Sequence, residues 1–205
     1  MSNYLKSAII IEDMEAIYSC FKSASLQFKN KTMLITGSTG MLPSYIVLYF
    51  IYLHIYKKIP LRIIAIARNE NKARKLFGHY TCMDFFDLVL ANVNDPISVS
   101  GKVDFIIHGA SLASPQYYKY KPVDTMLPNI FGTYNLLEMA KRNKLDAFLY
   151  FSSGSIYGGL PENSIVNENY GGWIDPLAVN SCYAESKRMG ETMCVAFYRQ
   201  YGVPV

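Results

Sequence analysis

The segment Lys31-Thr32-Met33-Leu34-Ile35-Thr36-Gly37-Ser38-Thr39-Gly40 decides the fold of this chain. Its first part is a short apolar run, two glycines follow, and a second apolar stretch begins at Leu42. Gly37 and Gly40 lack the Cβ atoms that would keep the backbone away from a bound phosphate. A strand, a glycine turn and a helix in this order favour binding of a dinucleotide pyrophosphate at the helix N-terminus.

Apolar runs alternate with helical patterns along the rest of the chain. The sequence predicts strands at 31–36, 61–67, 85–91, 103–108 and 147–152, and helices at 42–57, 69–77, 128–143 and 181–201. Strands that are continuous apolar runs separated by helices indicate a parallel sheet buried on both faces. The predicted fold class is therefore α/β, a doubly wound parallel sheet of the Rossmann type. We expect residues 1–30 to be an N-terminal helical extension and residues 31–205 to be the dinucleotide-binding domain.

Composition and charge exclude several classes of protein. The chain has 205 residues, 51% of them hydrophobic and 18% charged, which is typical of a globular protein with a large core. The net charge of +4 comes from scattered lysines and arginines, so we expect no nucleic-acid partner. The apolar stretch 45–56 is shorter than the ~20 residues of a membrane span, so it predicts a helix buried against the sheet and no membrane partner.

The cysteines and histidines give no sign of a metal site. The four cysteines form no CxxC pair and show no metal-ligand spacing, which favours free thiols in a cytoplasmic protein. The chain has only three histidines, and of these only His108 stands at the end of a predicted strand. Gly109 and Ala110, directly after it, are small residues that would let a cofactor approach the end of that strand.

A second motif, Tyr183-Ala184-Glu185-Ser186-Lys187, places a phenol and an ammonium on one face of the last predicted helix. A free phenol has a pKa of ~10, too high for a base at neutral pH, and a nearby cation favours its ionised form. Ser153 follows the fifth predicted strand, at the carboxyl edge where ligands of open parallel sheets bind. Ser153, Tyr183 and Lys187 are therefore the predicted catalytic residues, acting on a sugar hydroxyl.

These motifs resemble the extended short-chain dehydrogenases/reductases, in the NAD-dependent epimerase/dehydratase group that acts on nucleotide sugars. The resemblance covers roughly residues 31–205. It rests on Thr36-Gly37-x-x-Gly40, His108-x-Ala110, Asn129-x-x-Gly132-Thr133, Ser152-Ser153 with Tyr157-Gly158, and Tyr183-x-x-x-Lys187. Segments 113–122 and 182–194 are most similar to the UDP-glucuronate decarboxylases and their neighbours, the dTDP-glucose 4,6-dehydratases.

The resemblance implies an activity and a set of site residues. Tightly held NAD would take a hydride from the sugar and later return it, and the transient ketone would permit epimerisation, loss of water or loss of a carboxylate, as in capsule or polysaccharide biosynthesis. It implies a homodimer formed through the helices 128–143 and 181–201. The implied substrate contacts are Ser114, Asn129 and Ser153. The implied cofactor contacts are Gly37, Ser38, Thr39, Gly40, Met41, Leu42, Arg68, Asn92, Val93, Gly109, Ala110, Ser111, Tyr183 and Lys187.

The sequence departs from the family pattern at four places. Gly154 and Ser155 stand where the dehydratases carry an acid pair and the decarboxylases a glutamate, which weakens both assignments. Arg68 stands where NAD users often carry an aspartate for the ribose, and an arginine there can meet the 2′-phosphate of NADP. Asn92 replaces a frequent aspartate near the adenine, and Pro43 replaces a glycine.

The chain stops at Val203-Pro204-Val205, which resembles the start of a further strand. In the family a C-terminal portion completes the sheet and supplies much of the nucleotide-sugar pocket, so we expect a fragment that binds dinucleotide but turns over sugar poorly. Two alternatives stay open: a non-catalytic NAD(P)-binding protein, and an NADP-dependent reductase of a small carbonyl compound.

Overall fold

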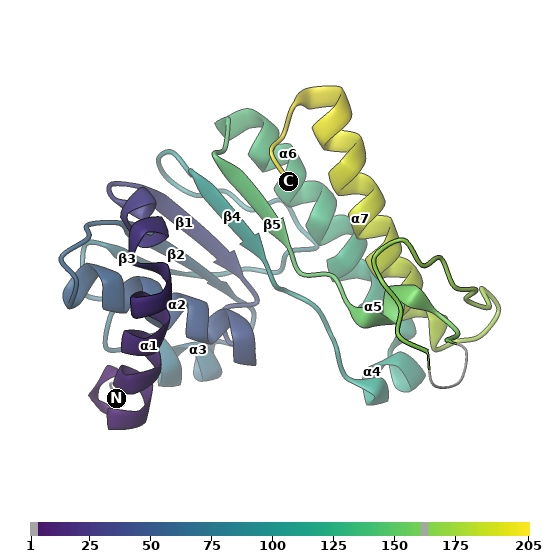
Figure 1. The fold of residues 1–205 in the computed structure, drawn as a ribbon, viewed down its shortest axis with the longest axis horizontal. Coiled ribbons are helices and arrows are strands. Elements are labelled where there is room, and N and C mark those ends of the chain that lie inside the picture. Colours follow the sequence, from purple (N-terminus) through teal and green to yellow (C-terminus); the bar gives the residue numbers. More distant parts are fainter. Residues whose placement is uncertain (1–3, 161–163) are drawn as a thin grey trace.

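A five-stranded parallel sheet forms the centre of the molecule, in the order β3-β2-β1-β4-β5 (Figure 1). The computed structural model describes residues 4–160 and 164–205, so residues 1–3 of the predicted N-terminal extension lie outside the described residues. The strands are β1 (Thr32–Thr36), β2 (Arg62–Ala67), β3 (Phe86–Leu90), β4 (Phe105–His108) and β5 (Ala147–Tyr150). This confirms the predicted doubly wound parallel sheet and its five strands.

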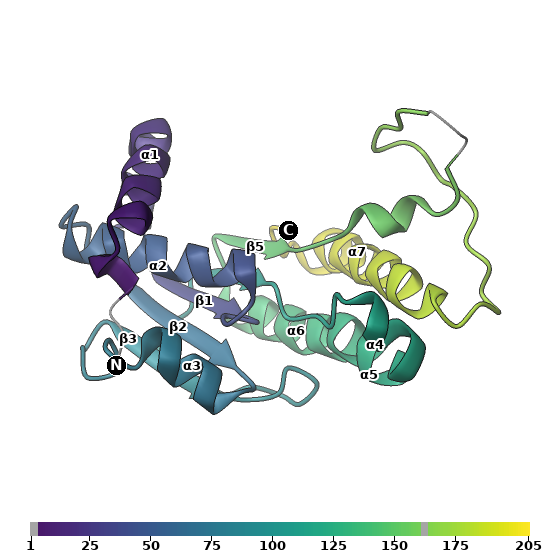
Figure 2. The ribbon, with the colours of Figure 1, turned by 90° about the horizontal axis from the view of Figure 1, so that it is seen from below.

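Helices cover both faces of the sheet. They are α1 (Ala8–Ser25), α2 (Met41–Ile55), α3 (Glu70–Phe77), α4 (Pro115–Tyr120), α5 (Pro122–Leu127), α6 (Thr133–Asn143) and α7 (Ser181–Tyr201). Helices α1, α2 and α3 contribute to one apolar cluster, and α6 and α7 contribute to the other (Figure 2). Parallel strands need such crossover helices, and burial on both faces explains why each strand is almost uniformly apolar.

The apolar stretch predicted to be a buried helix is α2. Val47, Ile51 and Leu53 are fully buried, and the same cluster holds Met33 and Ile35 of β1. Within the described part of the chain, no helix combines the length and the apolarity that a bilayer crossing requires. The hydrophobicity of α2 is therefore accounted for by the sheet on one side and by α1 on the other.

Helix α1 packs into the same cluster as α2 through Met14, which is fully buried. An ion pair of 2.7 Å between Lys57 Nζ and Glu15 Oε2 joins the two helices at their edge. Short 3₁₀ turns precede and follow α1, at Tyr4–Lys6 and Leu26–Phe28. The division of the chain at residue 31 stays a prediction, since α1 shares its core with the sheet.

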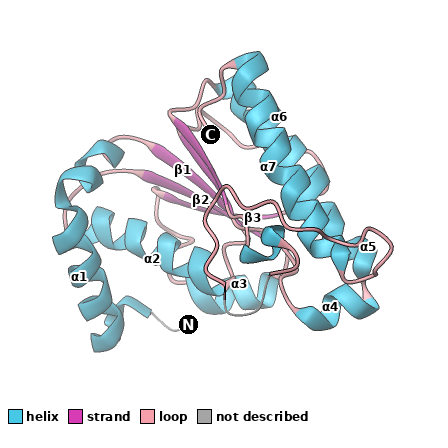
Figure 3. Ribbon diagram, turned by 45° about the vertical axis from the view of Figure 1, so that its right-hand side comes forward, coloured by secondary structure: helices cyan, strands magenta, loops and turns pink. Residues whose placement is uncertain are grey.

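The prediction of a helix beginning at Pro128 was wrong at its N-terminal end. Two short helices, α4 and α5, precede this position, and Pro115 and Pro122 each stand in a first turn, where proline lacks no intrahelical bond. Residues Pro128–Gly132 then form a π-helical turn that leads into α6. The wider turn accommodates the proline inside a helical stretch, which a straight α-helix would not. Figure 3 shows α4 and α5 near the N-terminal end of α7.

Neighbouring strands are in register at the carboxyl edge of the sheet. Thr36 pairs with Ile66 on one side and with His108 on the other. The chain runs from β1 through β2 to β3, and then returns to place β4 on the opposite side of β1. The carboxyl ends of β1 and β4 therefore form a topological switch point, the usual position of a ligand in such sheets. At β5, the last strand of the sheet, the N–H of Phe148 donates a bond of 2.7 Å to the Pro204 carbonyl.

Candidate active site

The glycine turn after β1 lies against the segment that follows β4. Gly37 has a φ of +65°, a conformation that glycine adopts without strain. A Cβ atom at this position would lie 2.7 Å from the backbone N and Cα of Ala110. The two loops of the switch point can therefore touch only because residue 37 has no side chain.

We expect Gly37→Ala to destabilise the protein by about 2–4 kcal/mol, because it combines a left-handed alanine with a clash against backbone atoms that cannot rotate away. Dinucleotide affinity should fall as well, since the turn must move. Denaturant unfolding measures the first effect and calorimetric titration the second. Gly154→Ala is the matched control, because a Cβ there meets nothing within 4 Å. Equal stability of the two variants would contradict the role given to Gly37.

Thr36 and His108, at the carboxyl ends of β1 and β4, form a buried hydrogen-bonded pair at the switch point. The Nε2 atom of His108 lies 3.2 Å from the Pro128 carbonyl oxygen, which can only accept, so Nε2 carries the proton. The Nδ1 atom then accepts from the Thr36 hydroxyl at 2.8 Å. Burial, together with the charge of Lys187, lowers the pKa of His108 to about 3. His108 is thus a neutral positioning residue that connects β1, β4 and the π-helical turn.

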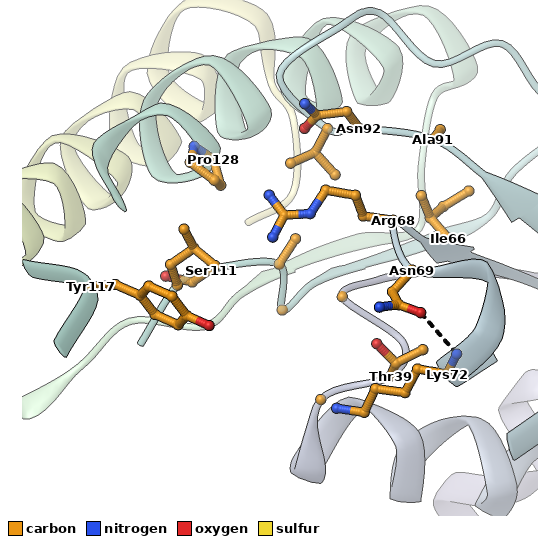
Figure 4. Close-up of a pocket in the computed structure, with 16 residues that line it drawn as sticks. Thr39, Ile66, Arg68, Asn69, Lys72, Ala91, Asn92, Ser111, Tyr117 and Pro128 are labelled. Carbon is orange, nitrogen blue, oxygen red and sulfur yellow. Dashed lines mark hydrogen bonds between the residues drawn. The ribbon is translucent and has the colours of Figure 1, made fainter. Parts of the chain in front are cut away.

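A cavity of about 360 Å³ opens at this carboxyl edge, a volume typical of small-molecule sites (Figure 4). Nine predicted cofactor residues line it: Gly37, Thr39, Gly40, Arg68, Asn92, Val93, Gly109, Ala110 and Ser111. The Oγ atom of Ser111 is buried and has no hydrogen-bond partner among the described residues, which leaves it available to a ligand. The predicted turn and the ends of three strands thus meet at one cavity.

Other predicted cofactor residues lie off the cavity. Ser38 is fully buried and donates through its hydroxyl to the Ile66 carbonyl at 2.9 Å, so it holds the turn against β2. Met41 and Leu42, at the start of α2, are 80% and 59% exposed. Sequence reasoning missed seven lining residues, which are Ile66, Asn69, Lys72, Ala91, Leu112, Tyr117 and Pro128. Tyr117 comes from α4, which was not predicted, and Pro128 begins the helical stretch that was predicted at 128–143.

Tyr183 and Lys187 lie on the buried face of α7, 7% and 3% exposed. Lys187 Nζ donates to the Phe151 carbonyl at 2.6 Å and lies 5.9 Å from the centre of the Tyr183 ring. Burial lowers the pKa of Lys187 to about 8. The Tyr183 ring stacks on Tyr118 with centroids 4.6 Å apart. The helix therefore brings the phenol and the ammonium together, as their spacing predicted, and holds each against a different neighbour.

Ser153 follows β5 and begins a 3₁₀ turn, Gly154–Tyr157. Its Oγ accepts a bond of 3.2 Å from the N–H of Ser155. The turn is held against α7 by Arg188, whose Nε donates to the Ile156 carbonyl at 2.7 Å. Because Arg188 directly follows Lys187 in α7, this bond places the serine segment beside the part of α7 that carries Lys187. The anchoring role of Arg188 was not predicted from the sequence.

The predicted substrate contacts Asn129 and Ser114 are not among the residues that line the cavity. Asn129 is fully buried in the π-helical turn, and its Nδ2 donates to Ser186 Oγ at 2.9 Å. Ser186 Oγ in turn donates to the Tyr183 carbonyl at 2.8 Å. Asn129 therefore supports the turn of α7 that carries Tyr183, while Ser114 precedes the first residue of α4. Contact of either residue with substrate stays a prediction.

The fold and the site define an α/β protein with a cavity at the switch point of its sheet and a buried tyrosine–lysine pair on α7. The sequence profile of the NAD dependent epimerase/dehydratase family matches residues 33–205, and the chain belongs to this family. It is 36% identical over 178 residues to UDP-glucuronic acid decarboxylase 1 of Danio rerio, covering 85% of this chain and 40% of that protein. It is 34% identical to UDP-glucuronic acid decarboxylase 6 of Arabidopsis thaliana, covering 86% and 49%. The chain thus spans less than half the length of these two relatives.

Solved structures share the fold. The dTDP-glucose 4,6-dehydratase of Bacillus anthracis in complex with NAD matches with a TM-score of 0.61 at 23% identity, over 85% of this chain and 53% of that one. The UDP-glucuronic acid 4-epimerase of Bacillus cereus, also in complex with NAD, matches with a TM-score of 0.64 at 20% identity, over 84% and 53%. The predicted family is therefore confirmed, and it is one of NAD-dependent enzymes.

Proposed function

We propose that this chain carries the cofactor-binding and proton-transfer half of an enzyme that modifies a nucleotide sugar by transient oxidation. The observation that carries the proposal is the position of Tyr183 and Lys187, which are buried on α7, with Lys187 Nζ bonded to the Phe151 carbonyl directly after β5. Family membership and the decarboxylase relatives support the same class of substrate.

The residues present fit a dinucleotide. The N–H groups of the glycine turn and of the first turn of α2 would hold the pyrophosphate. Gly109, Ala110 and the unpartnered Ser111 hydroxyl would face it from β4. When bound, NAD supplies the hydride acceptor and donor of the reaction. Everything else in the mechanism is proton handling and positioning by this chain.

Tyr183 is the proposed base for the sugar hydroxyl. Burial lowers the pKa of Lys187 to about 8, so at lower pH its side chain is largely protonated and places an ammonium near the Tyr183 ring. The Phe151 carbonyl holds the ammonium in place. Tyr183 would accept the hydroxyl proton as the ketone forms and return it when the ketone is reduced. Ser153 would donate a hydrogen bond to the same sugar oxygen.

The segment after Ser153 bears on the type of reaction. Elimination of water needs an acid that protonates the departing hydroxyl, and Gly154 and Ser155 offer no carboxylate. Epimerisation requires only oxidation and return of the hydride to the other face of the ketone. The proposed reaction is therefore transient oxidation without dehydration.

The test incubates the chain with NAD and, in separate reactions, UDP-glucuronic acid, UDP-glucose or dTDP-glucose. Chromatography follows the nucleotide sugar, and near-ultraviolet absorbance follows reduction of the bound cofactor, which requires only the first half of the cycle. Reduction with at least one nucleotide sugar, and with no free monosaccharide, is expected. Steady oxidation of NADPH by small carbonyl compounds, without any nucleotide sugar, would instead favour a simple reductase.

We further propose that two copies of the chain associate through α6 and α7. Tyr134, Tyr198 and Tyr201 on these helices are each between 44% and 58% exposed. Tyr134 and Tyr201 both contact the Phe197 ring, so these two tyrosines lie on either helix around one position. Aromatic side chains of this kind are enriched at interfaces.

Sedimentation at micromolar concentration is expected to show a dimer. Tyr198→Glu should shift it to a monomer, because the change places a charge in the interface. Tyr120→Glu, at a tyrosine that is 73% exposed on α4, is the control and should remain dimeric. A wild-type monomer would contradict the interface.

A further inference from the structure

We propose that the cavity contains a subsite for a ribose 2′-phosphate, so that this chain binds NADP more tightly than NAD. The inference rests on the proposed function, because it takes the cavity to hold a dinucleotide. It concerns the part of the cavity formed by Arg68, Asn69 and Lys72. Two of the solved structures that share this fold are complexes with NAD.

Arg68 occupies the position that meets the adenosine ribose in sheets of this type. It is the first residue after β2, whose neighbour in the sheet is β1. The glycine turn is fastened to the same strand end, since the Ser38 N–H and hydroxyl both donate to the Ile66 carbonyl, at 3.2 and 2.9 Å. The pyrophosphate turn and Arg68 are therefore held at a fixed separation. In Figure 4 the Arg68 side chain extends into the cavity.

Lys72 supplies a second cation on the same wall. Asn69 caps α3 by accepting a bond of 2.9 Å from the N–H of Lys72. This bond fixes the backbone of Lys72 in the first turn of α3, one helical turn beyond Arg68. Both side chains line the cavity and both are exposed to solvent.

The charges on this wall have one sign. Among the described residues that line the cavity, only Arg68 and Lys72 carry a charge at neutral pH. No aspartate or glutamate is among these described residues. The nearest acid in sequence, Glu70, forms a 2.6 Å ion pair with Arg74. In the described structure, no hydrogen bond or ion pair engages the guanidinium of Arg68 or the ammonium of Lys72.

A 2′-hydroxyl and a 2′-phosphate make opposite demands on this wall. The hydroxyl of NAD is usually held by an aspartate or glutamate acceptor at the end of β2, whereas the phosphate of NADP is accommodated by arginine. A carboxylate would repel the phosphate, and two unpaired cations attract it. The wall formed by Arg68 and Lys72 therefore matches the phosphate and lacks the acceptor for the hydroxyl.

The test is calorimetric titration of the complete chain with NADP and NAD, and with the fragments 2′,5′-ADP and 5′-AMP. The fragments isolate the 2′-phosphate from the rest of the cofactor. NADP should bind about 10-fold or more tightly than NAD, the scale of one charge-assisted contact. The preference should shrink as salt is added, because exposed charges are screened.

Substitutions assign the effect to the wall. Arg68→Gln should weaken NADP binding by about 10-fold or more and change NAD binding by less than about 3-fold. Arg68→Asp should reverse the preference by replacing the cation with an acceptor. Arg142→Gln removes an equal charge from an exposed position on α6 and is the matched control.

The outcomes separate this inference from the proposed function. Tighter binding of NAD than of NADP, with Arg68→Gln leaving NADP unchanged, would overturn the phosphate subsite while the proposed function stands. Binding of no dinucleotide and neither fragment would overturn both. Loss of NADP and NAD affinity to the same degree in Arg68→Gln would also overturn the subsite, since the arginine would then act on the shared part of the cofactor.

Discussion

Tyr183→Phe is expected to lower sugar oxidation by about 10³-fold, within the range found for removal of a general base, while dinucleotide affinity stays unchanged. The phenol oxygen is the atom proposed to take the hydroxyl proton, and phenylalanine cannot replace it. The ring itself should stay in place, because it is 7% exposed and stacks on Tyr118 with centroids 4.6 Å apart. Loss of activity would then reflect chemistry and not unfolding.

The measurement is reduction of the bound cofactor by the nucleotide sugar, with titration of the dinucleotide on the same preparation. Tyr120→Phe removes an equivalent hydroxyl from a residue that is 73% exposed and should retain wild-type rates. A Tyr183→Phe protein that oxidises sugar within about 3-fold of wild type would contradict general-base catalysis by this residue. A variant that has also lost dinucleotide affinity would indicate a binding role instead.

The fold could be predicted because its signals are local and repeated. Each strand is a continuous apolar run buried on both faces, so its position and its parallel arrangement follow from hydrophobicity alone. The helices at 115–127 escaped prediction because each is one to two turns long and carries no sustained apolar period. The prolines at 115 and 122 were the available signal, since proline favours a first helical turn.

The site could be predicted only where one residue type carries the chemistry. Gly37 was predictable because only glycine allows the contact with Ala110. Lys72 reaches the cavity through a helix cap at Asn69, so its role depends on where α3 begins. The burial of Asn129 and its hydrogen bond to Ser186 of α7 could not be predicted from the sequence, whereas its contact with substrate stays a prediction. The surroundings of Lys72 and Asn129 depend on contacts between segments far apart in the sequence, which residue spacing cannot predict.

Lys187→Met is expected to abolish most sugar oxidation and at the same time to raise the free energy of unfolding at pH 7 by about 1–2 kcal/mol. Lys187 is 3% exposed, and burial lowers its pKa to about 8, below the ~10.4 of a free lysine. The folded protein therefore bears the cost of a buried ammonium throughout the range below pH 8. Methionine has a similar shape and no charge. Methionine leaves the Phe151 carbonyl without its hydrogen-bond donor. This costs about 1 kcal/mol, which is already subtracted from the expected gain in the free energy of unfolding.

The pH dependence of the free energy of unfolding shows whether Lys187→Met stabilises the protein by removing a buried charge or by packing better. Between pH 8 and about 10, the folded wild-type protein loses the proton of Lys187 before the unfolded chain does, so the wild type gains stability as pH rises. The advantage of Lys187→Met should therefore be constant below pH 8 and shrink toward pH 10, whereas a packing gain would be the same at every pH. Urea unfolding of both proteins at several pH values measures the difference, with Lys22→Met on the exposed side of α1 as the control. A variant that is less stable than wild type at pH 7, by a margin independent of pH, would show that Lys187 contributes to packing and is not a charge held in the core for catalysis.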